Sequence, residues 1–282
     1  MRIGAFGDSN VNIFQGLNYN RHVISIYKFK GVNIKSLLNK SDSYKKITNI
    51  LSNKKYDICF FVFGNVDVNF YYYYKKYNFN ESNIFEKMKK HIKNYVNLIK
   101  NLPNIKIPII INIQVPSIID SLDFKQSLSN YNTLDINVNV SNDDLAYENR
   151  LNRVIILNNL LKINCKKYNL KFCDISKYCL DKNNVVIKFL TCLHNKCNIH
   201  PNFENILIIY LNFCLSFLFK LKKFPSYNEI LNNLKHFQYD SYIKRLHDKY
   251  PDKKSNINEM IFNKEEIQKY INKIKKIHSI KV

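Results

Sequence analysis

Short apolar runs that stop at turn residues alternate along this chain with longer segments of helical periodicity, and this alternation limits the possible folds. The apolar runs lie at residues 2–6, 22–29, 57–63, 107–115 and 170–175. The run at 57–63 is apolar without interruption, which is typical of a strand buried on both faces. Strands that alternate with helices predict a three-layer α/β/α fold around a parallel sheet.

Segments of helical periodicity fill the gaps between these runs. Helices are expected at residues 43–51, 82–99, 142–168 and 203–219, with Ser82 capping the second. Residues 116–142 are polar and rich in Asn and Ser, so they are expected to form an irregular surface excursion.

The pattern changes near residue 220. Residues 1–220 are predicted to form one α/β domain, while residues 221–282 hold short, Lys-rich amphipathic stretches. We interpret the second part as a basic helical C-terminal extension. It either packs against the main domain or binds a partner independently.

The chain is strongly basic, with 44 Lys and Arg against 22 Asp and Glu and a formal net charge of +22. It also holds 43 Asn and only two Ala, a skew that follows AT-rich codons. The lysines are spread along the chain instead of being gathered on one element. Nucleic acid is therefore not the expected ligand, although the charge attracts polyanions nonspecifically.

The N-terminus indicates an intracellular, cytoplasmic protein, because a short strand and a turn stand where a signal peptide would place a long apolar region. The most apolar run, residues 206–219, is shorter than the roughly 20 residues of a membrane-spanning helix. The odd count of 7 Cys indicates free thiols in a reducing compartment. The oligomeric state is left open.

Three of the 5 glycines stand at the carboxyl ends of predicted strands, where ligands of parallel sheets bind. They are Gly7, Gly31 and Gly64, and each neighbours polar residues. A glycine allows a backbone N–H to face a ligand, as in an oxyanion hole, although an ordinary turn also uses one. His200 lies in the loop before the last core helix, where it can face Ser9 at the same edge of the sheet.

These motifs resemble the blocks of the SGNH (GDSL-like) hydrolase superfamily, in their order and over about residues 2–219. GDSN, which contains Ser9, is similar to the nucleophile block, and FKGVNIKSL, which contains Gly31, is similar to the glycine block. GNVDV at Gly64 resembles the third block, and NIHPN resembles the last block, with His200 in the place of the catalytic histidine. The superfamily has a flavodoxin-like fold and contains esterases, lipases and carbohydrate acyl-ester hydrolases.

The resemblance implies covalent acyl transfer without a cofactor. Ser9 would be the nucleophile and His200 the base, with the N–H groups of Ser9 and Gly31 and the side chain of Asn65 as oxyanion donors. The substrate would be a small-molecule or glycan acyl ester, such as an acetylated carbohydrate. Water as acceptor makes the protein an esterase, and a sugar hydroxyl or amine makes it an acyltransferase.

Two positions depart from the pattern of the superfamily. Val66 stands where the third block commonly has Asn, so Asn65 would have to act from the neighbouring position. Cys197 stands where the triad acid is expected, and a thiol cannot stabilise an imidazolium as a carboxylate does. A backbone carbonyl, or a carboxylate such as Asp67 or Asp8, would have to support His200.

Three alternatives remain open at this level. The first is a zinc site formed by four soft ligands, Cys192, His194, Cys197 and His200. The second is a noncatalytic binding module of the same fold for a glycan or a protein partner. The third concerns Tyr72 and Tyr73, which either contact the substrate or belong to the packing.

Overall fold

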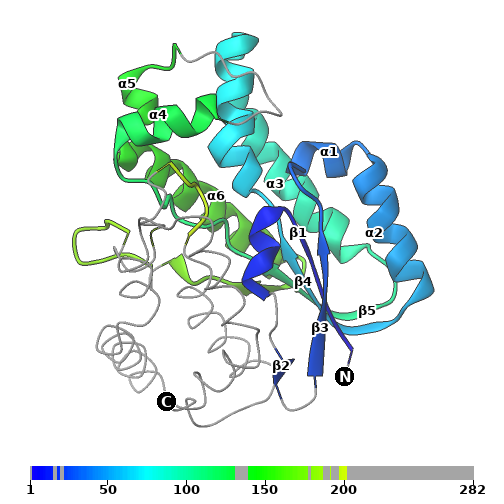
Figure 1. The fold of residues 1–282 in the computed structure, drawn as a ribbon. Helices are drawn as coiled ribbons and strands as arrows, with labels where there is room; N and C mark the ends of the chain where they lie inside the picture. The colour runs from blue at the N-terminus through cyan, green and yellow to red at the C-terminus, as the bar shows by residue number, and fades with distance from the viewer. Residues whose placement is uncertain are drawn as a thin grey trace.

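A computed structural model describes residues 2–14, 18–19, 22–130, 139–176, 179–186, 191 and 197–201. Its centre is a six-stranded sheet in the order β2–β3–β1–β4–β5–β6 (Figure 1). The strands are β1 (Ile3–Gly7), β2 (Asn18–Tyr19), β3 (His22–Lys28), β4 (Tyr56–Val62), β5 (Ile105–Ile111) and β6 (Lys171–Cys173).

The neighbouring strands β3, β1, β4, β5 and β6 are all parallel to one another. The short β2 pairs with β3 in the antiparallel sense. Counted in chain order without β2, the parallel strands follow the order 2-1-3-4-5 of flavodoxin-like sheets. The predicted parallel α/β fold is therefore confirmed for the described residues. This order places the topological switch point, where such sheets bind ligands, between β1 and β4.

The two strands at the switch point are the most deeply buried. All five residues of β1 are buried, and so are all residues of β4 except Asp57. The ring of Phe6 stacks between those of Tyr27 and Phe61, with ring centroids 4.8 and 5.6 Å away. Layers on both faces explain why these runs are apolar without alternation.

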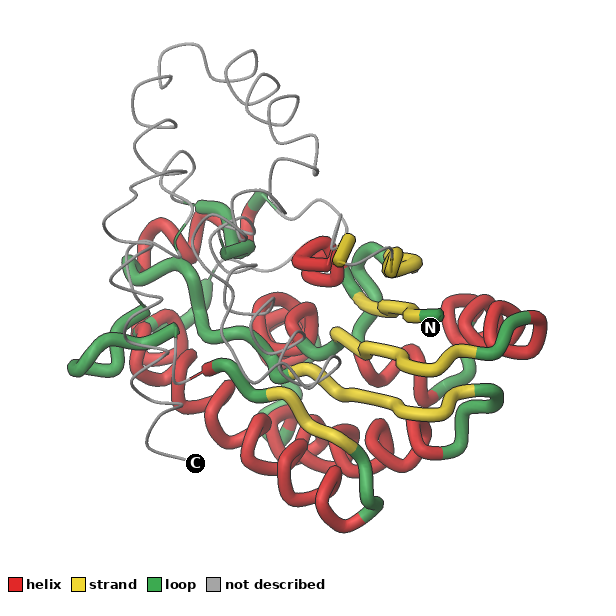
Figure 2. The backbone as a smooth tube through the Cα atoms, turned by 90° about the horizontal axis from the view of Figure 1, so that it is seen from below, coloured by secondary structure: helices red, strands yellow, loops and turns green. Residues whose placement is uncertain are grey.

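Helices cover one face of the sheet, and a short 3-10 helix, η1 (Ser9–Phe14), lies against the other (Figure 2). The covering helices are α1 (Ile34–Leu38), α2 (Asp42–Asn53), α3 (Ile84–Lys100) and α6 (Tyr147–Lys167). The residues that α3 buries recur at helical spacing: Ile84, Met88, Ile92, Tyr95, Val96 and Ile99. The predicted amphipathic helix is thus present, although Asn83 and not Ser82 holds its N-cap position.

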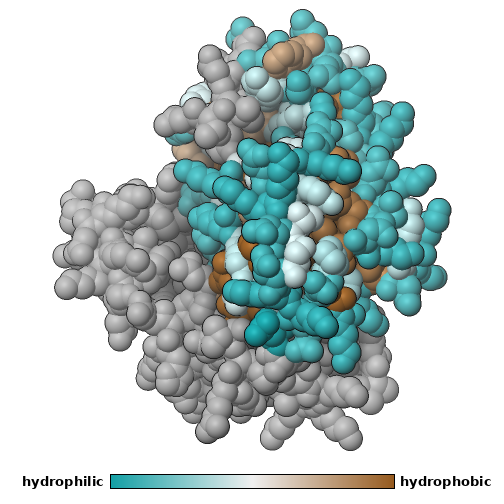
Figure 3. Space-filling model, turned by 90° about the vertical axis from the view of Figure 1, so that its right-hand side faces the viewer, coloured by the Kyte–Doolittle hydropathy of each residue, from teal (hydrophilic) through white to brown (hydrophobic). Residues whose placement is uncertain are grey.

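The side of the molecule that carries α2 is mostly hydrophilic, with apolar side chains visible only in narrow strips (Figure 3). Helix α2 buries Ile47 and Leu51 toward the core and exposes its lysines. The basic charge on this element is therefore a solvated helix face.

The structure corrects the expectation that residues 116–142 are irregular, because α4 (Ser121–Ser129) lies within them. The Asp120 carboxylate caps α4 by accepting hydrogen bonds from the N–H groups of Leu122 and Asp123. Phe124 and Leu128, one helical turn apart, are buried beneath it. The helix was not predicted because the segment is mostly polar and the helix buries only one narrow apolar face.

The single helix expected at residues 142–168 is two helices, α5 (Asn142–Leu145) and α6. The break is at Ala146, which has extended backbone angles of φ −56° and ψ 136°. The tyrosine-rich segment after β4 forms two wide π-helical turns, η2 (Asp67–Tyr71) and η3 (Tyr74–Asn78).

The helix expected at residues 203–219 and the C-terminal extension at 221–282 lie outside the described residues. Among the described helices, none combines the length and the hydropathy that a membrane crossing requires.

Candidate active site

Ser9 lies at the turn between β1 and η1. The backbone N–H of Asp8 continues the sheet by donating to Val62 O at 2.9 Å, and the chain then turns away. Asp8 Oδ1 accepts a hydrogen bond from Asn10 N at 2.9 Å, which closes an Asx-turn around Ser9. A Cβ at Gly7 would meet Val62 O at 2.5 Å, so only glycine allows this close approach of β1 and β4.

His200 reaches Ser9 from a loop 191 positions later in the chain, and its Nε2 lies 2.6 Å from Ser9 Oγ. The loop is fixed by Ser117, whose hydroxyl donates to Ile199 O at 2.7 Å. The structure therefore brings together the two side chains that the sequence placed at one edge of the sheet. This distance is within the range for proton transfer from a nucleophile to its base.

The surroundings of His200 favour the neutral form of its imidazole. Burial lowers the pKa of its imidazole to about 4, and the nearby charge of Lys28 acts in the same direction. The ring is therefore neutral at pH 7 and has a lone pair for a proton.

Ser9 and Gly31, the two residues whose backbone N–H groups were predicted as oxyanion donors, lie together at the pocket. Both residues line the same pocket, and within the described part of the chain neither N–H donates to another group. Gly31 has a φ of 72°, a left-handed conformation that favours glycine.

The side chain of Asn65 forms hydrogen bonds with Asp8 and Gln114. Its Nδ2 donates to Asp8 Oδ2 at 3.3 Å, and its Oδ1 accepts from Gln114 N at 2.9 Å. The side chain is buried, and Val66, not Asn65, lines the pocket. The structure thus places the predicted third oxyanion donor as a brace between β1 and the segment after β5.

Two buried carboxyl groups lie next to this brace. Burial raises the pKa of Asp8 to about 6 against the hydrogen bonds from Asn10 and Asn65. Burial also raises the pKa of Asp67 to about 7, and the neighbouring Asp8 adds to the increase. Asp67 accepts hydrogen bonds from Ile34 N at the start of α1. Among the bonds seen in the described residues, neither carboxyl group reaches His200.

The pocket beside Ser9 and His200 has a volume of about 230 Å³. Its wall is partly polar and partly apolar, with a contribution from the end of α4 that the sequence did not signal. Among the residues that line it are Lys30, Val66, Phe70, Ser127, Asn130 and Cys197.

Tyr72 and Tyr73 lie away from this pocket, in a buried cluster around Asp144. Tyr72 Oη donates to Asp144 Oδ1 at 3.0 Å, and Tyr73 Oη donates to Asp144 O at 3.0 Å. Arg153 binds the same carboxylate at 3.1 Å and the Tyr73 hydroxyl at 2.7 Å. The structure therefore places both tyrosines in packing and does not bring them to Ser9.

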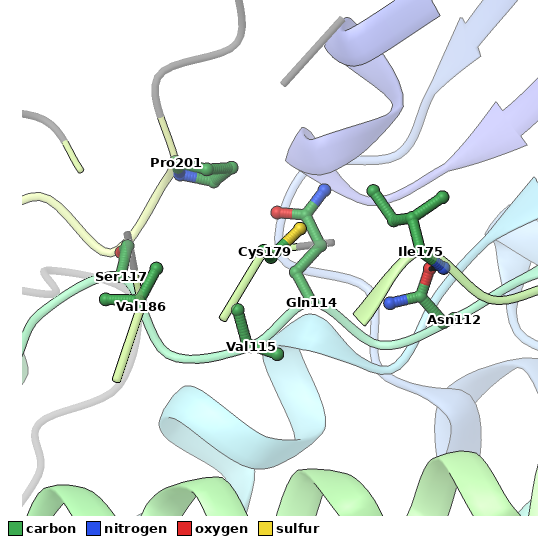
Figure 4. A pocket seen from close by; sticks show the side chains of 8 residues that line it. All are labelled: Asn112, Gln114, Val115, Ser117, Ile175, Cys179, Val186 and Pro201. Atoms are coloured by element: carbon green, nitrogen blue, oxygen red, sulfur yellow. Dashed lines mark hydrogen bonds between the residues drawn. The ribbon is translucent and has the colours of Figure 1, made fainter. Parts of the chain in front are cut away.

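A second, much smaller cavity of about 10 Å³ lies near Pro201, between the segments that follow β5 and β6 (Figure 4). The amide of Gln114 points into it, and neither amide atom has a hydrogen-bond partner in the described part of the chain. The cavity has room for about one water molecule. It is too small for a substrate.

No group of three or more His, Cys, Asp or Glu side chains within the described residues has the arrangement of a metal site. Cys192 and His194, two of the four ligands in the zinc alternative, lie outside those residues. The other two point in different directions, because His200 Nε2 faces Ser9 and the Cys197 thiol donates to Gln126 Oε1 at 3.2 Å.

Comparisons with known proteins give structural neighbours only. No protein-family model and no curated protein sequence matches the chain. A GDSL-like lipase from Bacteroides thetaiotaomicron aligns over 78% of this chain and 89% of its own, with 12% identity and a TM-score of 0.48. The acetyl xylan esterase AlAXEase aligns over 74% of this chain and 96% of its own, with 17% identity and a TM-score of 0.43.

An α/β hydrolase from the metagenome of Lake Arreo, Spain, covers 74% of this chain and 93% of its own, with 12% identity and a TM-score of 0.40. The chemistry of the site follows from the contacts of Ser9 and His200 themselves.

Proposed function

We propose that this chain is a serine acyl-ester hydrolase or acyltransferase that uses Ser9 as nucleophile and His200 as base. The observation that carries the proposal is the 2.6 Å contact between Ser9 Oγ and His200 Nε2, at the wall of a pocket. Ser9 and Gly31 line this pocket, and their backbone N–H groups donate to no other group in the described part of the chain. A nucleophile, a base and oxyanion donors at one site are the elements of covalent acyl transfer.

The reaction begins when Ser9 Oγ attacks the ester carbonyl carbon and its proton passes to His200 Nε2. The N–H groups of Ser9 and Gly31 donate to the oxygen that becomes negative in the tetrahedral intermediate. Collapse of the intermediate breaks the bond to the alcohol, which takes the proton from His200. Water or an acceptor hydroxyl then attacks the acyl-serine, again losing its proton to His200, and Ser9 is restored.

The pocket favours a small acyl group on a polar alcohol such as a sugar. Val66 and Phe70 offer apolar surface for the acyl group, while Lys30, Ser127 and Asn130 offer polar groups to hydroxyls. A volume of about 230 Å³ is below the usual range of pockets for drug-sized ligands, so a long acyl chain would extend beyond it.

The first experiment is labelling of the full chain with a fluorophosphonate probe, followed by mass mapping of the labelled peptide. Label is expected on Ser9 alone. Ser9→Ala should abolish it, and His200→Ala should slow it by about 10³-fold or more. Ser129→Ala is the matched control, because this exposed serine of α4 is not part of the pocket wall. Absence of label on Ser9 together with absence of turnover of p-nitrophenyl acetate would refute the proposal.

A binding module for a glycan or partner is the second candidate. It is favoured by one observation: the side chain that lies 3.0 Å from His200 Nδ1 is the neutral amide of Asn198, which stabilises an imidazolium less than a carboxylate does. Acetylated oligosaccharide titrated into the Ser9→Ala variant distinguishes the two. A binding module keeps its affinity and shows no turnover in the unmodified chain.

A further inference from the structure

The loop that holds His200 contains an Asx-turn formed by Asn198. Its Oδ1 accepts a hydrogen bond from the backbone N–H of His200 at 3.0 Å. The same oxygen lies 3.0 Å from His200 Nδ1. The peptide of Asn198 is itself held, because the Ser117 hydroxyl lies 3.3 Å from Asn198 O and 2.7 Å from Ile199 O.

This geometry fixes which atom of the amide faces the imidazole. A backbone N–H can only donate, so the Asn198 atom beside it must be the oxygen and not the NH₂ group. Facing an oxygen, His200 Nδ1 must carry the proton of the neutral ring. Nε2 then has the lone pair, which points at Ser9 Oγ.

Cys197 does not take part in this arrangement. Its thiol lies at the pocket wall and donates to Gln126 Oε1 of α4. Cys197, three residues before His200, therefore connects the loop to α4. Asn198, two residues before His200, contacts the ring.

We propose that Asn198 is the positioning residue of the site: its amide oxygen selects the tautomer in which His200 accepts the proton of Ser9, without supplying a negative charge. This inference rests on the proposed function for its catalytic consequence. The orientation is the one that a carboxylate would impose, whereas the amide of Asn198 is neutral and brings no charge to stabilise an imidazolium.

The charged groups around the ring make that absence matter. Lys28 of β3 opposes protonation of His200, and Lys30 adds positive charge at the pocket wall. Asp8 lies on the Ser9 side, and its carboxylate oxygens accept hydrogen bonds from Asn10 and Asn65. Asn198→Asp would place a carboxylate at Nδ1, keep the Asx-turn, and favour the charged ring.

The test compares the full chain with Asn198→Asp, Asn198→Ala and the matched control Asn94→Asp, which makes the same Asn-to-Asp change on the exposed face of α3. The pH profile of kcat/KM is measured with p-nitrophenyl acetate, and ¹⁵N NMR reads the tautomer and the pKa of His200. Asn198→Asp should raise kcat/KM at pH 7 about tenfold or more and move the acidic limb of the profile to higher pH. Asn198→Ala should lower kcat/KM at least tenfold and lose the preference for the Nδ1–H tautomer.

Asn94→Asp should change neither the tautomer nor the acidic limb, because its side chain is exposed on α3 and is not part of the pocket wall. The inference is overturned if Asn198→Ala keeps the wild-type tautomer and profile, or if Asn94→Asp gives the same gain as Asn198→Asp. The NMR measurement needs no turnover. A protein with the Nδ1–H tautomer that never labels at Ser9 would therefore contradict the proposed function and leave the positioning role of Asn198 supported.

Discussion

Two regions of this molecule bury carboxyl groups, and they compensate the charge in different ways. Asp144 is surrounded by Arg153, Lys76 and the hydroxyls of Tyr72 and Tyr77. Burial raises its pKa, but the hydrogen bonds from Lys76 and Tyr77 and the charge of Arg153 outweigh burial, so the pKa is lowered overall.

Asp8 and Asp67, beneath Ser9, have only backbone N–H groups and side-chain amides as partners among the described residues. Their pKa values are raised by burial to about 6 and about 7. The Asp144 cluster therefore keeps its charge constant across the neutral range, while the edge of the sheet at Ser9 changes its charge within that range. The first region is built for stability, and the second for a polar site whose groups titrate near neutral pH.

Removal of the cation from the Asp144 cluster should have the largest effect on stability. Arg153→Met is expected to lower the free energy of unfolding by about 3–5 kcal/mol, because among the described residues it leaves the buried Asp144 carboxylate with only Lys76 as a charge partner. Urea unfolding measures the loss. Lys89→Met is the control, since its pair with Glu86 is at the surface and should cost about 1 kcal/mol or less. Equal losses in the two variants would contradict the comparison.

The two regions should respond to pH with opposite signs. The folded-state pKa of Asp67 lies above its ordinary value of 3.8, so the folded state binds more protons than the unfolded state between these values. The contribution of Asp67 to the free energy of unfolding therefore falls as pH rises from about 4 to about 7. At pH 8, Asp67→Asn should therefore have a free energy of unfolding about 1–3 kcal/mol above that of the wild type, and a higher melting temperature. At pH 5 the increase in the free energy of unfolding should be smaller.

For Asp144 the folded-state pKa is lowered, so its contribution is present above pH 4 and is lost as pH falls. Asp144→Asn should be less stable than wild type at pH 8, with a deficit that shrinks toward acidic pH. Thermal melts of the three proteins between about pH 2 and pH 8 check both signs, because the contribution of Asp144 is lost only below about pH 4. A gain in Asp67→Asn that did not grow with pH would show that burial of its charge is not the cause.

Tyr72 should matter for stability and not for catalysis. Tyr72→Phe removes a hydrogen bond to Asp144 and one from Lys76, and is expected to cost about 1–2 kcal/mol. The KM for acyl esters should stay the same. Tyr74→Phe should cost less than about 0.5 kcal/mol, because its ring packs on Phe79 and its hydroxyl has no hydrogen bond among the described residues. A raised KM in Tyr72→Phe would place Tyr72 at the substrate after all.

The smallest expected effect is a gain. Gln114→Met should stabilise the protein by about 0.5–1 kcal/mol, because the buried amide of Gln114 has no partner in the described part of the chain. Asn112 lines the same cavity, but its amide donates to Ile113 O at 2.9 Å, so Asn112→Leu should destabilise the protein. Chemical denaturation of both variants measures the two signs. Destabilisation by Gln114→Met would indicate that the amide holds a well-bound water.

Much of the fold could be predicted because burial on two faces leaves a direct trace in the sequence. The strands β1 and β4 and the helix α3 follow apolar runs and helical spacing within a few residues. The helix α4 was missed because its stability depends on one capping carboxylate and two buried side chains within a polar stretch. The break at Ala146 was missed because Ala favours helix locally, and the burial of Asp144 against Arg153 is a tertiary constraint.

The candidate site divides in the same way. Short motifs indicated Ser9, Gly31 and His200, because a turn after a strand and a loop before a helix are local features. The partner of the imidazole was not found, although an Asn two residues before His200 is a local signal for an Asx-turn. The position of Ser117 and the committed hydrogen bonds of Asn65 had no signal in the sequence, since both join segments far apart in the chain.

The sequence by itself determined the order of strands and helices and the residue types at the sheet edge, because hydrophobic periodicity and backbone preferences act over a few residues. Only the tertiary structure decided which polar groups meet. Hydrogen bonds across 191 residues, and the burial that moves the pKa values of Asp67 and His200, exist only once the sheet has brought distant turns to one edge.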